Sequence, residues 1–454
     1  MDDHRSVNGM TQQRITSYDK YLSRTAMRRK PSALRELQKY VGSDLVLMAG
    51  GMPNGELFPI VEADLILRDG RKLTIKPEEM KRALQYGVTK GMTDIIDWTK
   101  VLQRRVHQPP TLLRDGSPTS APSDMDIIMC NGCQEAISKS LEAVLNEGDA
   151  ILLEEATYPN VMSVGSPLGA KAVSVPSDSS GMIPSELRNI LATWDTDKRG
   201  PRPKIMYCVP TGGNPTGASW SLDRKKAVYN IARQYDFLIL EDDPYYYIQY
   251  GRPLTPSFLS LDEDGRVIRC DSFSKLIAAG ARLGFISGPQ YLLQKLVLHM
   301  DCSVACTNNL AQTVIRKILE DMGHDGFLQH GERLAAFYKY RADKIVAIAE
   351  KRLKGLAEWS PPDGGMFMWI KLLGVKSSEP VVQRVIEKGA VLVNGFHFLA
   401  EPRETPYIRV SFSYASEDDM NKAFTWLAEA LTEFHEDERN KGKGLGKDYN
   451  HHQI

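Results

Sequence analysis

The sequence has few cysteines, no excess of either charge and no long apolar run, and each absence excludes a class of protein. Six cysteines among 454 residues are too few for a disulfide framework and favour a reducing compartment. Lys+Arg and Asp+Glu both number 57, which argues against general binding to nucleic acid or anionic membranes. No stretch approaches roughly 18 apolar residues, and the polar, acidic start predicts no secretory signal. We therefore expect a cytoplasmic protein without a membrane partner, with the mitochondrion as the alternative location.

The two ends of the chain differ in composition from its middle, where hydrophobic residues are abundant enough for large cores. Hydrophobic residues make up 42% of the chain and charged residues 25%. Residues 1–45 are polar and predict an N-terminal arm, with six basic and no acidic residues between Lys20 and Arg35. The last residues, 437–454, are rich in Lys, Gly, Asn and His and predict a disordered tail.

Seven short apolar runs between residues 125 and 288 have the length of buried strands: MDIIMC, DAILLEE, AKAVSV, KIMYCV, FLILE, RVIRCD and LGFIS. Helical patterns separate several of them, which is typical of a mostly parallel sheet covered on both faces. Beyond residue 325 a long helix precedes shorter strands and helices, the last helix being predicted over 416–436. We therefore predict an α/β fold. A large domain (46–325) holds a mostly parallel seven-stranded sheet covered by helices, and a smaller α+β domain (326–436) follows.

Polar or aromatic residues follow five of the predicted strands. In open α/β sheets, ligands bind at the carboxyl ends of the strands, so these positions predict a site. They are residues 131–134, 156–159, 211–217, 242–245 and 271–275. A sheet with a purely structural role has no need of such residues at so many strand ends.

Residues 272–275 combine two hydroxyls with a lysine, and Arg282 follows shortly after. Hydroxyls and a guanidinium are typical of a phosphate site, and Lys275 beside them is a candidate nucleophilic amine. The alternative interpretation is a surface lysine that happens to follow a strand. Asn131 to Gln134 open a helix after another strand, and free amides at a helix start also favour phosphate.

The same segment contains Cys130 and Cys133, a C-x-x-C pair that also occurs in redox and metal sites. A structural zinc site needs two further ligands at suitable spacing. The other cysteine pair, Cys302 and Cys306, lies in a helix-like region without a partner motif. We therefore predict no metal site.

The remaining strand ends complete the chemistry of one ligand. Asp242 ends an apolar strand, and a buried carboxylate there needs a cationic partner such as a protonated ring nitrogen. The amide of Asn214 and the hydroxyl of Tyr245 are suited to donate to a phenolic oxygen. Tyr158 offers a face for stacking. An aromatic aldehyde with a ring nitrogen, a ring oxygen and a phosphate is pyridoxal phosphate.

Seven segments occur in a familiar order: MAGGMPN at 48–54, ALQYG at 83–87, TGGNPTG at 211–217, EDDPYYY at 241–247, DSFSK at 271–275, GGMFMWI at 364–370 and YIRVSFS at 407–413. Together they resemble the class I/II aminotransferases of fold type I. The similarity is greatest to the branch of kynurenine/α-aminoadipate and fungal aromatic amino acid aminotransferases. It extends over about residues 45–435. The resemblance implies a fold type I enzyme with pyridoxal phosphate as its cofactor.

The resemblance also implies roles for single residues around the cofactor. Lys275 is expected to bond to its aldehyde carbon and to move protons, and Asp242 to face its ring nitrogen. Asn214 and Tyr245 are expected at the ring oxygen, and Tyr158 on the ring face. The expected phosphate contacts are Cys133, Gln134, Ser272, Ser274 and Arg282. Cys133 departs from the serine that the family places there, so its side-chain contact is an open question.

On the substrate side, the resemblance assigns Arg409 to the α-carboxylate and places the Gly51 backbone against it. Asn214 also contacts substrate, and Phe367 is either a wall of the substrate pocket or ordinary core. Arg409 has the alternative interpretation of a strand-edge arginine. Tyr86 matches a tyrosine that reaches the phosphate of the neighbouring subunit, which implies a homodimer with composite sites.

The expected reaction moves the α-amino group of an aromatic amino acid, kynurenine or 2-aminoadipate to 2-oxoglutarate in a ping-pong cycle. Two alternatives use the same cofactor. One is β-elimination or decarboxylation on the same fold, because a fold does not fix the chemistry. The other is a transcription regulator with an aminotransferase-like body, but residues 1–45 show no helix-turn-helix pattern.

Overall fold

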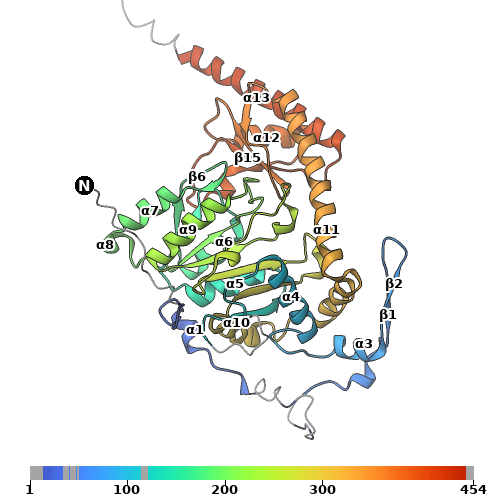
Figure 1. Ribbon diagram of the computed structural model, residues 1–454. Coiled ribbons are helices and arrows are strands. Elements are labelled where there is room, and N and C mark those ends of the chain that lie inside the picture. The colour runs from blue at the N-terminus through green and yellow to red at the C-terminus, as the bar shows by residue number, and fades with distance from the viewer. Residues whose placement is uncertain are drawn as a thin grey trace, which may run out of the picture.

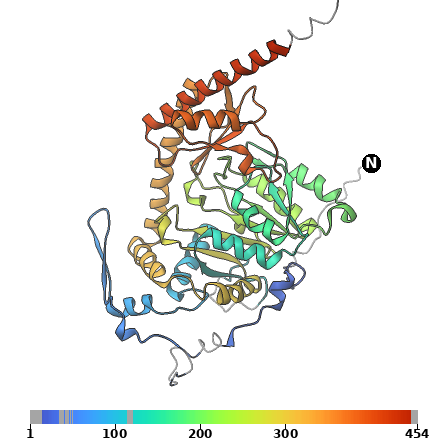
Figure 2. The ribbon, with the colours of Figure 1, turned by 180° about the vertical axis from the view of Figure 1, so that it is seen from behind.

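The computed structural model describes residues 14–33, 40, 46, 48, 51–113 and 121–445. Its largest element is a central sheet with helices on both sides, and a smaller sheet lies beside it, reached through one long helix (Figures 1 and 2). Within the described ranges, no helix is both long and apolar enough to span a bilayer.

The central sheet contains all seven predicted strands. They are β3 (Met125–Cys130), β4 (Ala150–Glu154), β5 (Lys171–Val175), β8 (Ile205–Cys208), β9 (Leu238–Asp242), β10 (Val267–Ser272) and β11 (Gly284–Pro289). Their order is β3-β11-β10-β9-β8-β4-β5, and β11 is antiparallel to both of its neighbours. The other pairs are parallel. The predicted α/β class is confirmed, and the strands are buried on both faces except for the edge strand β5, of which only Val175 is buried.

Helices between, before and after the strands cover the sheet, chiefly α4 (Thr93–Val106), α5 (Cys133–Val144), α6 (Pro159–Gly165), α7 (Pro184–Ala192), α9 (Leu222–Tyr235) and α10 (Gln290–Ser303). Helix α9 shows how the sequence sets such boundaries. The Ser221 side chain accepts a hydrogen bond from the Arg224 amide at 3.2 Å, and left-handed Asp236 ends the helix.

The small domain has a second hydrophobic core around an antiparallel sheet of order β12-β13-β15-β14. Its strands are β12 (Ala357–Trp359), β13 (Phe367–Leu372), β14 (Val393–Asn394) and β15 (Tyr407–Ser411), packed with α12 (Glu379–Lys388) and α13 (Glu417–Leu445). Helix α11 (Asn309–Arg352) joins it to the large domain and is broken at Gly323, whose φ is 62°. Strand β12 has only three residues and was not predicted.

The two domains touch through glycines that allow their backbones to meet. Gly212 follows β8, and Gly365 precedes β13. A Cβ on Gly212 would lie 2.4 Å from the Gly365 nitrogen, and both residues have positive φ values of 51° and 69°. No side chain fits between these two loops.

The two ends of the chain differ from the prediction. Helix α13 continues to Leu445, so residues 437–445 are helical, whereas 446–454 lie outside the described residues. Charged residues such as Glu, Arg and Lys are good helix formers, and polar composition alone therefore does not end a helix. An ion pair of 2.6 Å between Arg384 and Asp437 also holds this turn against α12.

Part of the predicted N-terminal arm belongs to the core of the large domain. Tyr18, Tyr21, Leu22 and Ala26 are buried in it, the last within helix α1 (Arg24–Arg28). The Tyr18 hydroxyl donates to the Gly265 carbonyl at 2.6 Å, so a polar-looking segment buries its rings while its hydroxyls stay bonded. Of this segment, residues 1–13, 34–39 and 41–45 lie outside the described residues.

A hairpin that was not predicted projects from the large domain (Figure 1). Strands β1 (Ala63–Ile66) and β2 (Lys72–Ile75) form it, and helix α3 (Pro77–Leu84) follows and packs on α11. Each strand has only four residues, and β1 is exposed at alternate positions. Such short strands give too little periodicity to be recognised in a sequence.

Candidate active site

A cavity of about 220 Å³ opens at the carboxyl ends of β9 and β10, and Phe367 of β13 forms its small-domain side. Parallel strands bring distant segments together here because their carboxyl ends share one edge of the sheet. The residues around the cavity are Cys133, Gln134, Ile137, Tyr158, Val209, Asn214, Asp242, Pro244, Tyr245, Ser272, Ser274, Lys275, Arg282 and Phe367. Most of the predicted site residues are therefore neighbours in the structure.

Asp242, the last residue of β9, presents a buried carboxylate to this cavity. Its Oδ2 accepts a hydrogen bond of 2.8 Å from the Tyr207 hydroxyl, whereas Oδ1 has no partner among the described residues. Burial raises the pKa of Asp242 to about 6, and the Tyr207 hydroxyl and then the Cys133 thiol, which lies beside this carboxylate, oppose that rise. An unbonded buried carboxylate oxygen is costly, so this side chain fits a ligand that brings an N–H donor or a positive charge.

The adjacent Asp243 is occupied elsewhere, in a buried ion-pair cluster. Arg269 Nη1 donates to Asp243 Oδ2 at 3.0 Å, and its Nη2 donates to Asp271 Oδ1 at 3.0 Å. The Thr211 hydroxyl also donates to Asp243, at 3.1 Å. Of the two consecutive aspartates, Asp242 is thus the one that faces the cavity.

Guanidinium and hydroxyl donors gather in another part of the cavity. Arg282 Nη1 donates to the Ser274 hydroxyl at 3.2 Å, and Nη2 donates to the Asn131 carbonyl at 3.1 Å. Gly132 has a φ of 85°, and a Cβ there would lie 2.7 Å from Arg282 Nη2. The glycine lets Arg282 lie beside the start of α5, where free amides favour an anion such as phosphate.

Lys275 lies in the turn after β10 and lines the same cavity. In the part of the chain that the structure describes, its ammonium group has no hydrogen-bond or ion-pair partner. An unpaired amine close to an anion site is suited to react with a carbonyl carbon of a phosphorylated ligand.

Tyr158 and Gln134 form an aromatic and amide side of the cavity. The Tyr158 hydroxyl donates to Gln134 Oε1 at 3.2 Å, and Asn160 donates to the same hydroxyl at 2.8 Å. These bonds hold the ring and leave its face for stacking. Tyr245 is buried and lies edge-on to Phe367, with ring centres 6.0 Å apart.

Arg409 of β15 does not line the cavity itself but contacts two residues that do, Asn214 and Phe367. Its Nη1 donates to Asn214 Oδ1 at 3.0 Å, and its guanidinium carbon lies 4.5 Å from the Phe367 ring centre and 4.7 Å from that of Phe398. Its Nε is buried without a partner among the described residues. A guanidinium held between rings and lacking a counter-ion there fits a planar carboxylate.

Three predicted residues do not line this cavity: Arg409, which contacts its lining residues Asn214 and Phe367, and Tyr86 and Gly51, which lie apart from it. Tyr86 follows α3 and is 60% exposed, and Gly51 is exposed with open space where a Cβ would lie. Their contacts with phosphate and with substrate therefore stay predictions.

Sequence reasoning missed Tyr207, Asn160 and Phe398. Tyr207 reads as one more apolar residue of a buried strand, and Phe398 lies in the short helix η7 (Gly395–Phe398) outside any motif. Asn160 carried a weak signal, since a polar residue two positions after a stacking tyrosine is close enough to bond to it.

The side chains around the cavity fit pyridoxal phosphate. The unbonded Asp242 Oδ1 matches a protonated ring nitrogen, and Asn214 and Tyr245 offer donors for the ring oxygen. Arg282 and the two serines match the phosphate, and Lys275 matches the aldehyde carbon.

Comparisons with known proteins agree with this site. The family model "Aminotransferase class I and II" matches residues 110–427. The mitochondrial kynurenine/alpha-aminoadipate aminotransferase of Mus musculus is 40% identical, over 92% of this chain and 99% of its own. An aromatic amino acid aminotransferase of Dictyostelium discoideum is 32% identical, over 92% of this chain and 89% of its own.

Solved structures show the same architecture. An aminotransferase of Candida albicans superposes with a TM-score of 0.82 at 28% identity, covering 92% of this chain and 98% of that one. The α-aminoadipate aminotransferase of Thermus thermophilus, in complex with N-(5'-phosphopyridoxyl)-L-leucine, gives 0.68 at 25% identity, covering 92% and 98%. The family match over most of the chain, joined to a cavity with the donors that the cofactor needs, places this protein among the class I and II aminotransferases, which depend on pyridoxal phosphate.

Proposed function

We propose that this enzyme transfers the α-amino group of an aromatic amino acid, kynurenine or 2-aminoadipate to 2-oxoglutarate. The observation that carries the proposal is Arg409, which lies beside Asn214 at the edge of the cavity without a carboxylate partner among the described residues. Every amino acid and every 2-oxo acid has a carboxylate of the kind that such an arginine binds.

The choice of donors is supported by the relatives and by the walls of the cavity. The mouse relative is named for kynurenine and α-aminoadipate, and the Dictyostelium relative for aromatic amino acids. Phe367 and Phe398 lie against Arg409, and their rings suit an aromatic side chain.

The residues of the chain take separate parts in the reaction that we propose. When bound, pyridoxal phosphate draws electrons from the substrate Cα and carries the amino group between the two half-reactions. Arg409 binds the substrate carboxylate and so orients Cα. Lys275 Nζ removes the proton from Cα as a general base and later returns a proton as a general acid. Asp242 Oδ1 would accept a hydrogen bond from the ring nitrogen, and Tyr207 holds that carboxylate in place.

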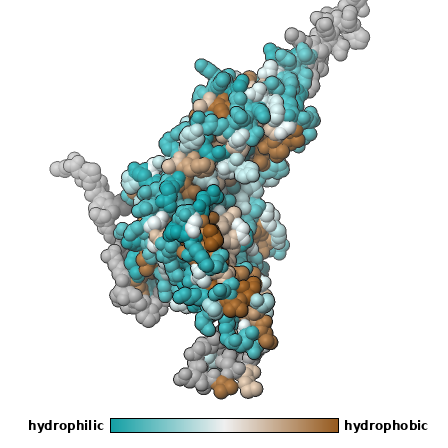
Figure 3. Space-filling view, turned by 90° about the vertical axis from the view of Figure 1, so that its right-hand side faces the viewer, coloured by the Kyte–Doolittle hydropathy of each residue, from teal (hydrophilic) through white to brown (hydrophobic). Residues whose placement is uncertain are grey.

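We further propose that the active species is a homodimer in which Tyr86 completes the neighbour's phosphate site. Apolar side chains are exposed over the hairpin and the segments next to it, and monomeric proteins rarely expose such groups together. The exposed residues are Leu57, Ile60, Val61, Ile66, Tyr86 and Val88. Figure 3, which faces this side of the molecule, shows several separate hydrophobic patches, in its lower part, near its centre and at its upper right.

For the compartment, we propose the cytoplasm, with the mitochondrial matrix as the alternative. The six cysteines carry no disulfide, which suits either reducing compartment. The name of the mouse relative places that protein in mitochondria. Fractionation of cells that produce the tagged full-length chain decides between the two.

A panel of amino donors tests the proposed reaction. Purified holoenzyme is incubated with 2-oxoglutarate and one donor at a time, and both products are quantified. We expect one glutamate for each 2-oxo acid, with the highest kcat/KM for aromatic amino acids, kynurenine or 2-aminoadipate. Ammonia and pyruvate without glutamate would indicate β-elimination, and release of CO₂ would indicate decarboxylation.

A further inference from the structure

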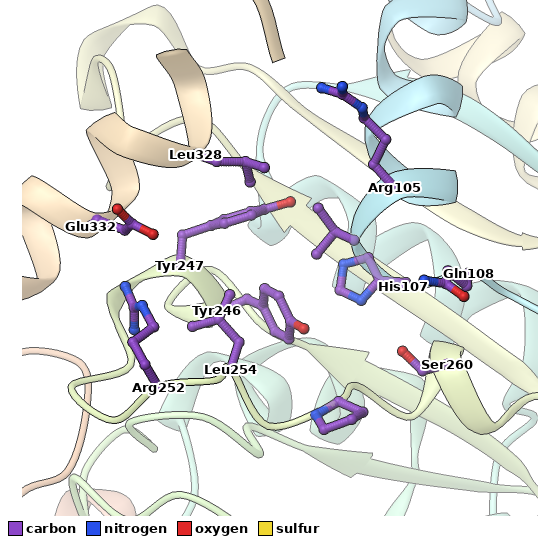
Figure 4. Close-up of a pocket in the computed structure, with 12 residues that line it drawn as sticks. Arg105, His107, Gln108, Tyr246, Tyr247, Arg252, Leu254, Ser260, Leu328 and Glu332 are labelled. Carbon is purple, nitrogen blue, oxygen red and sulfur yellow. The ribbon is translucent and has the colours of Figure 1, made fainter. Parts of the chain in front are cut away.

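A second cavity, of about 560 Å³, lies in the large domain among the tyrosines that follow β9 (Figure 4). It shares no lining residue with the active-site cavity. Its walls come from the end of α4, from the short helix η4 (Tyr246–Ile248) with the loop after it, and from α11. Cavities of this size are typical of small-molecule sites.

The inner wall of the second cavity is aromatic and contains two unpaired polar atoms. His107, Tyr246 and Tyr247 are only 2%, 2% and 5% exposed, and the rings of His107 and Tyr246 are 4.5 Å apart. His107 Nε2 and the Tyr247 hydroxyl are buried and have no hydrogen-bond partner among the described residues. Buried polar atoms are rarely left unpaired, so these two indicate a ligand with a polar group at the inner end.

The protonation state of His107 limits which polar group of a ligand can bind here, because a neutral imidazole carries a single N–H. Its Nδ1 lies 2.7 Å from the Ser257 hydroxyl, and burial, together with the Arg269 and Lys225 cations, holds its pKa well below the usual range. Nε2 is then a donor or an acceptor according to the tautomer, and the Tyr247 hydroxyl is both. A hydroxyl on the ligand matches either arrangement, because it also donates and accepts.

The opening of the cavity carries one cation and one anion that are not paired with each other. Arg252 Nη1 donates to the carbonyls of Gln249 and Gly251, at 2.6 and 2.8 Å, which holds its guanidinium at the opening. Neither Arg252 nor Glu332 makes an ion pair within the described part of the chain, and Figure 4 shows both on the same side of the cavity. The third charged residue, Arg105, is already paired with Asp325 at 3.0 Å.

These charges select among ligands. Glu332 would repel a simple carboxylate, and Arg252 would repel a simple amine, whereas a zwitterion satisfies both. Between the opening and the inner wall the cavity is apolar, with Leu254, Leu328 and Val106 beside the tyrosine rings. That surface suits an aromatic ring.

We propose that the second cavity binds a free aromatic α-amino acid with a hydroxyl on its ring. The α-carboxylate binds Arg252, the ammonium group binds Glu332, and the ring lies against Tyr246, Tyr247 and Leu254. The ring hydroxyl bonds to His107 Nε2 and to the Tyr247 hydroxyl. Tyr246 and Tyr247 directly follow Tyr245 of the active-site cavity, so this ligand contacts the segment that also lines the cofactor site.

The probe for this site is labelled α-methyl-L-tyrosine, which has the zwitterion and the phenol but no hydrogen on Cα for Lys275 to remove. Equilibrium dialysis with holoenzyme is expected to give two molecules per chain. One of them changes the absorption of the cofactor and the other does not. Because neither binding event requires turnover, the result is independent of the proposed reaction.

Variants test whether the molecule that leaves the cofactor absorption unchanged is bound in the second cavity. Leu254→Trp fills the apolar middle and should abolish this binding event, while Arg252→Gln and Glu332→Gln should each weaken it at least about tenfold. The control is Arg333→Gln, next to Glu332 on α11 but outside the cavity, which should leave both events unchanged. All four variants should keep the wild-type transamination rate, because none of these residues lines the active-site cavity.

Two results would overturn the proposal. One is a single bound molecule per chain. The other is a second molecule whose affinity is unaffected by Leu254→Trp and by both charge variants. A second probe, α-methyl-L-phenylalanine, checks the inner contacts. Without a ring hydroxyl it should bind the second cavity about tenfold more weakly, and equal affinity would contradict the assigned roles of His107 and Tyr247.

Discussion

The Tyr207 hydroxyl lies 2.8 Å from Asp242 Oδ2, and this bond orients a carboxylate whose other oxygen has no donor among the described residues. The two residues belong to β8 and β9, which are parallel neighbours, so the sheet itself brings them together. Asp242 is therefore held in place by a buried phenol on one side and is available to the cofactor on the other.

Tyr207→Phe removes that bond at almost unchanged shape. Since the bond lowers the pKa of Asp242, which is about 6, its loss should raise the pKa further. Asp242 is ionised above its pKa. With a higher pKa, a smaller fraction of Asp242 is ionised in the variant than in the wild type near neutral pH, and this difference disappears as the pH rises. We expect apoenzyme to bind pyridoxal phosphate about 5–10-fold more weakly near pH 7 and almost normally at higher pH. Fluorescence titration over a pH series measures this, and a pH-independent, wild-type affinity would contradict it.

Asp242→Asn keeps the shape of the side chain but removes its charge. The ring nitrogen then loses its anionic partner, and we expect kcat to fall by at least roughly 10²-fold with little change in melting temperature. Steady-state kinetics and calorimetry on the same preparation measure the two quantities.

Asp243→Asn is the matched comparison for this prediction. It breaks a buried ion pair with Arg269 and should cost about 3–5 kcal/mol of folding stability, while turnover of the folded fraction falls much less. If the two variants exchanged these effects, Asp243 would be the partner of the ring nitrogen.

Lys275 should carry the cofactor covalently. Borohydride treatment of the yellow holoenzyme should abolish its absorption band, and peptide mass mapping should find the reduced pyridoxyl group on Lys275. A Lys275→Ala chain should not form this adduct. An adduct on a different lysine would refute the assignment.

Arg409→Lys keeps a positive charge but loses the planar fork that stacks between Phe367 and Phe398. We expect kcat/KM to fall for every amino acid and every 2-oxo acid, by about 2–4 kcal/mol of transition-state binding, with the cofactor spectrum unchanged. A loss confined to acidic donors would mean that Arg409 binds the side chain and not the α-carboxylate.

Mixed dimers test the contribution of Tyr86. Chains with Lys275→Ala and chains with Tyr86→Phe should each have low activity alone, and co-expression should restore part of it because one site of the mixed dimer regains both residues. Sedimentation establishes the oligomeric state. A fully active monomer would rule out the composite site.

The sequence predicted those parts of the fold and site that depend on local pattern. Each strand of the central sheet contains a short apolar run, and the residues at the ends of β9 and β10 could be assigned to one site because parallel strands end at one edge. Tyr207 could not be found in this way, since its role depends on which strand lies beside β9. Tyr18 and Tyr21 were missed for a related reason, because burial of a polar-looking segment depends on a distant surface of the large domain.

The contact of Gly212 with Gly365 has a consequence for catalysis. Asn214 lies two residues after Gly212, and β13, which pairs with the strand of Arg409, begins two residues after Gly365. The separation between the cofactor side and the carboxylate side of the site is therefore set by main chain against main chain, with no flexible side chain between them. With Arg409 at the carboxylate, as we propose, the two halves of the site are already aligned when the chain folds, so less entropy is lost when substrate binds.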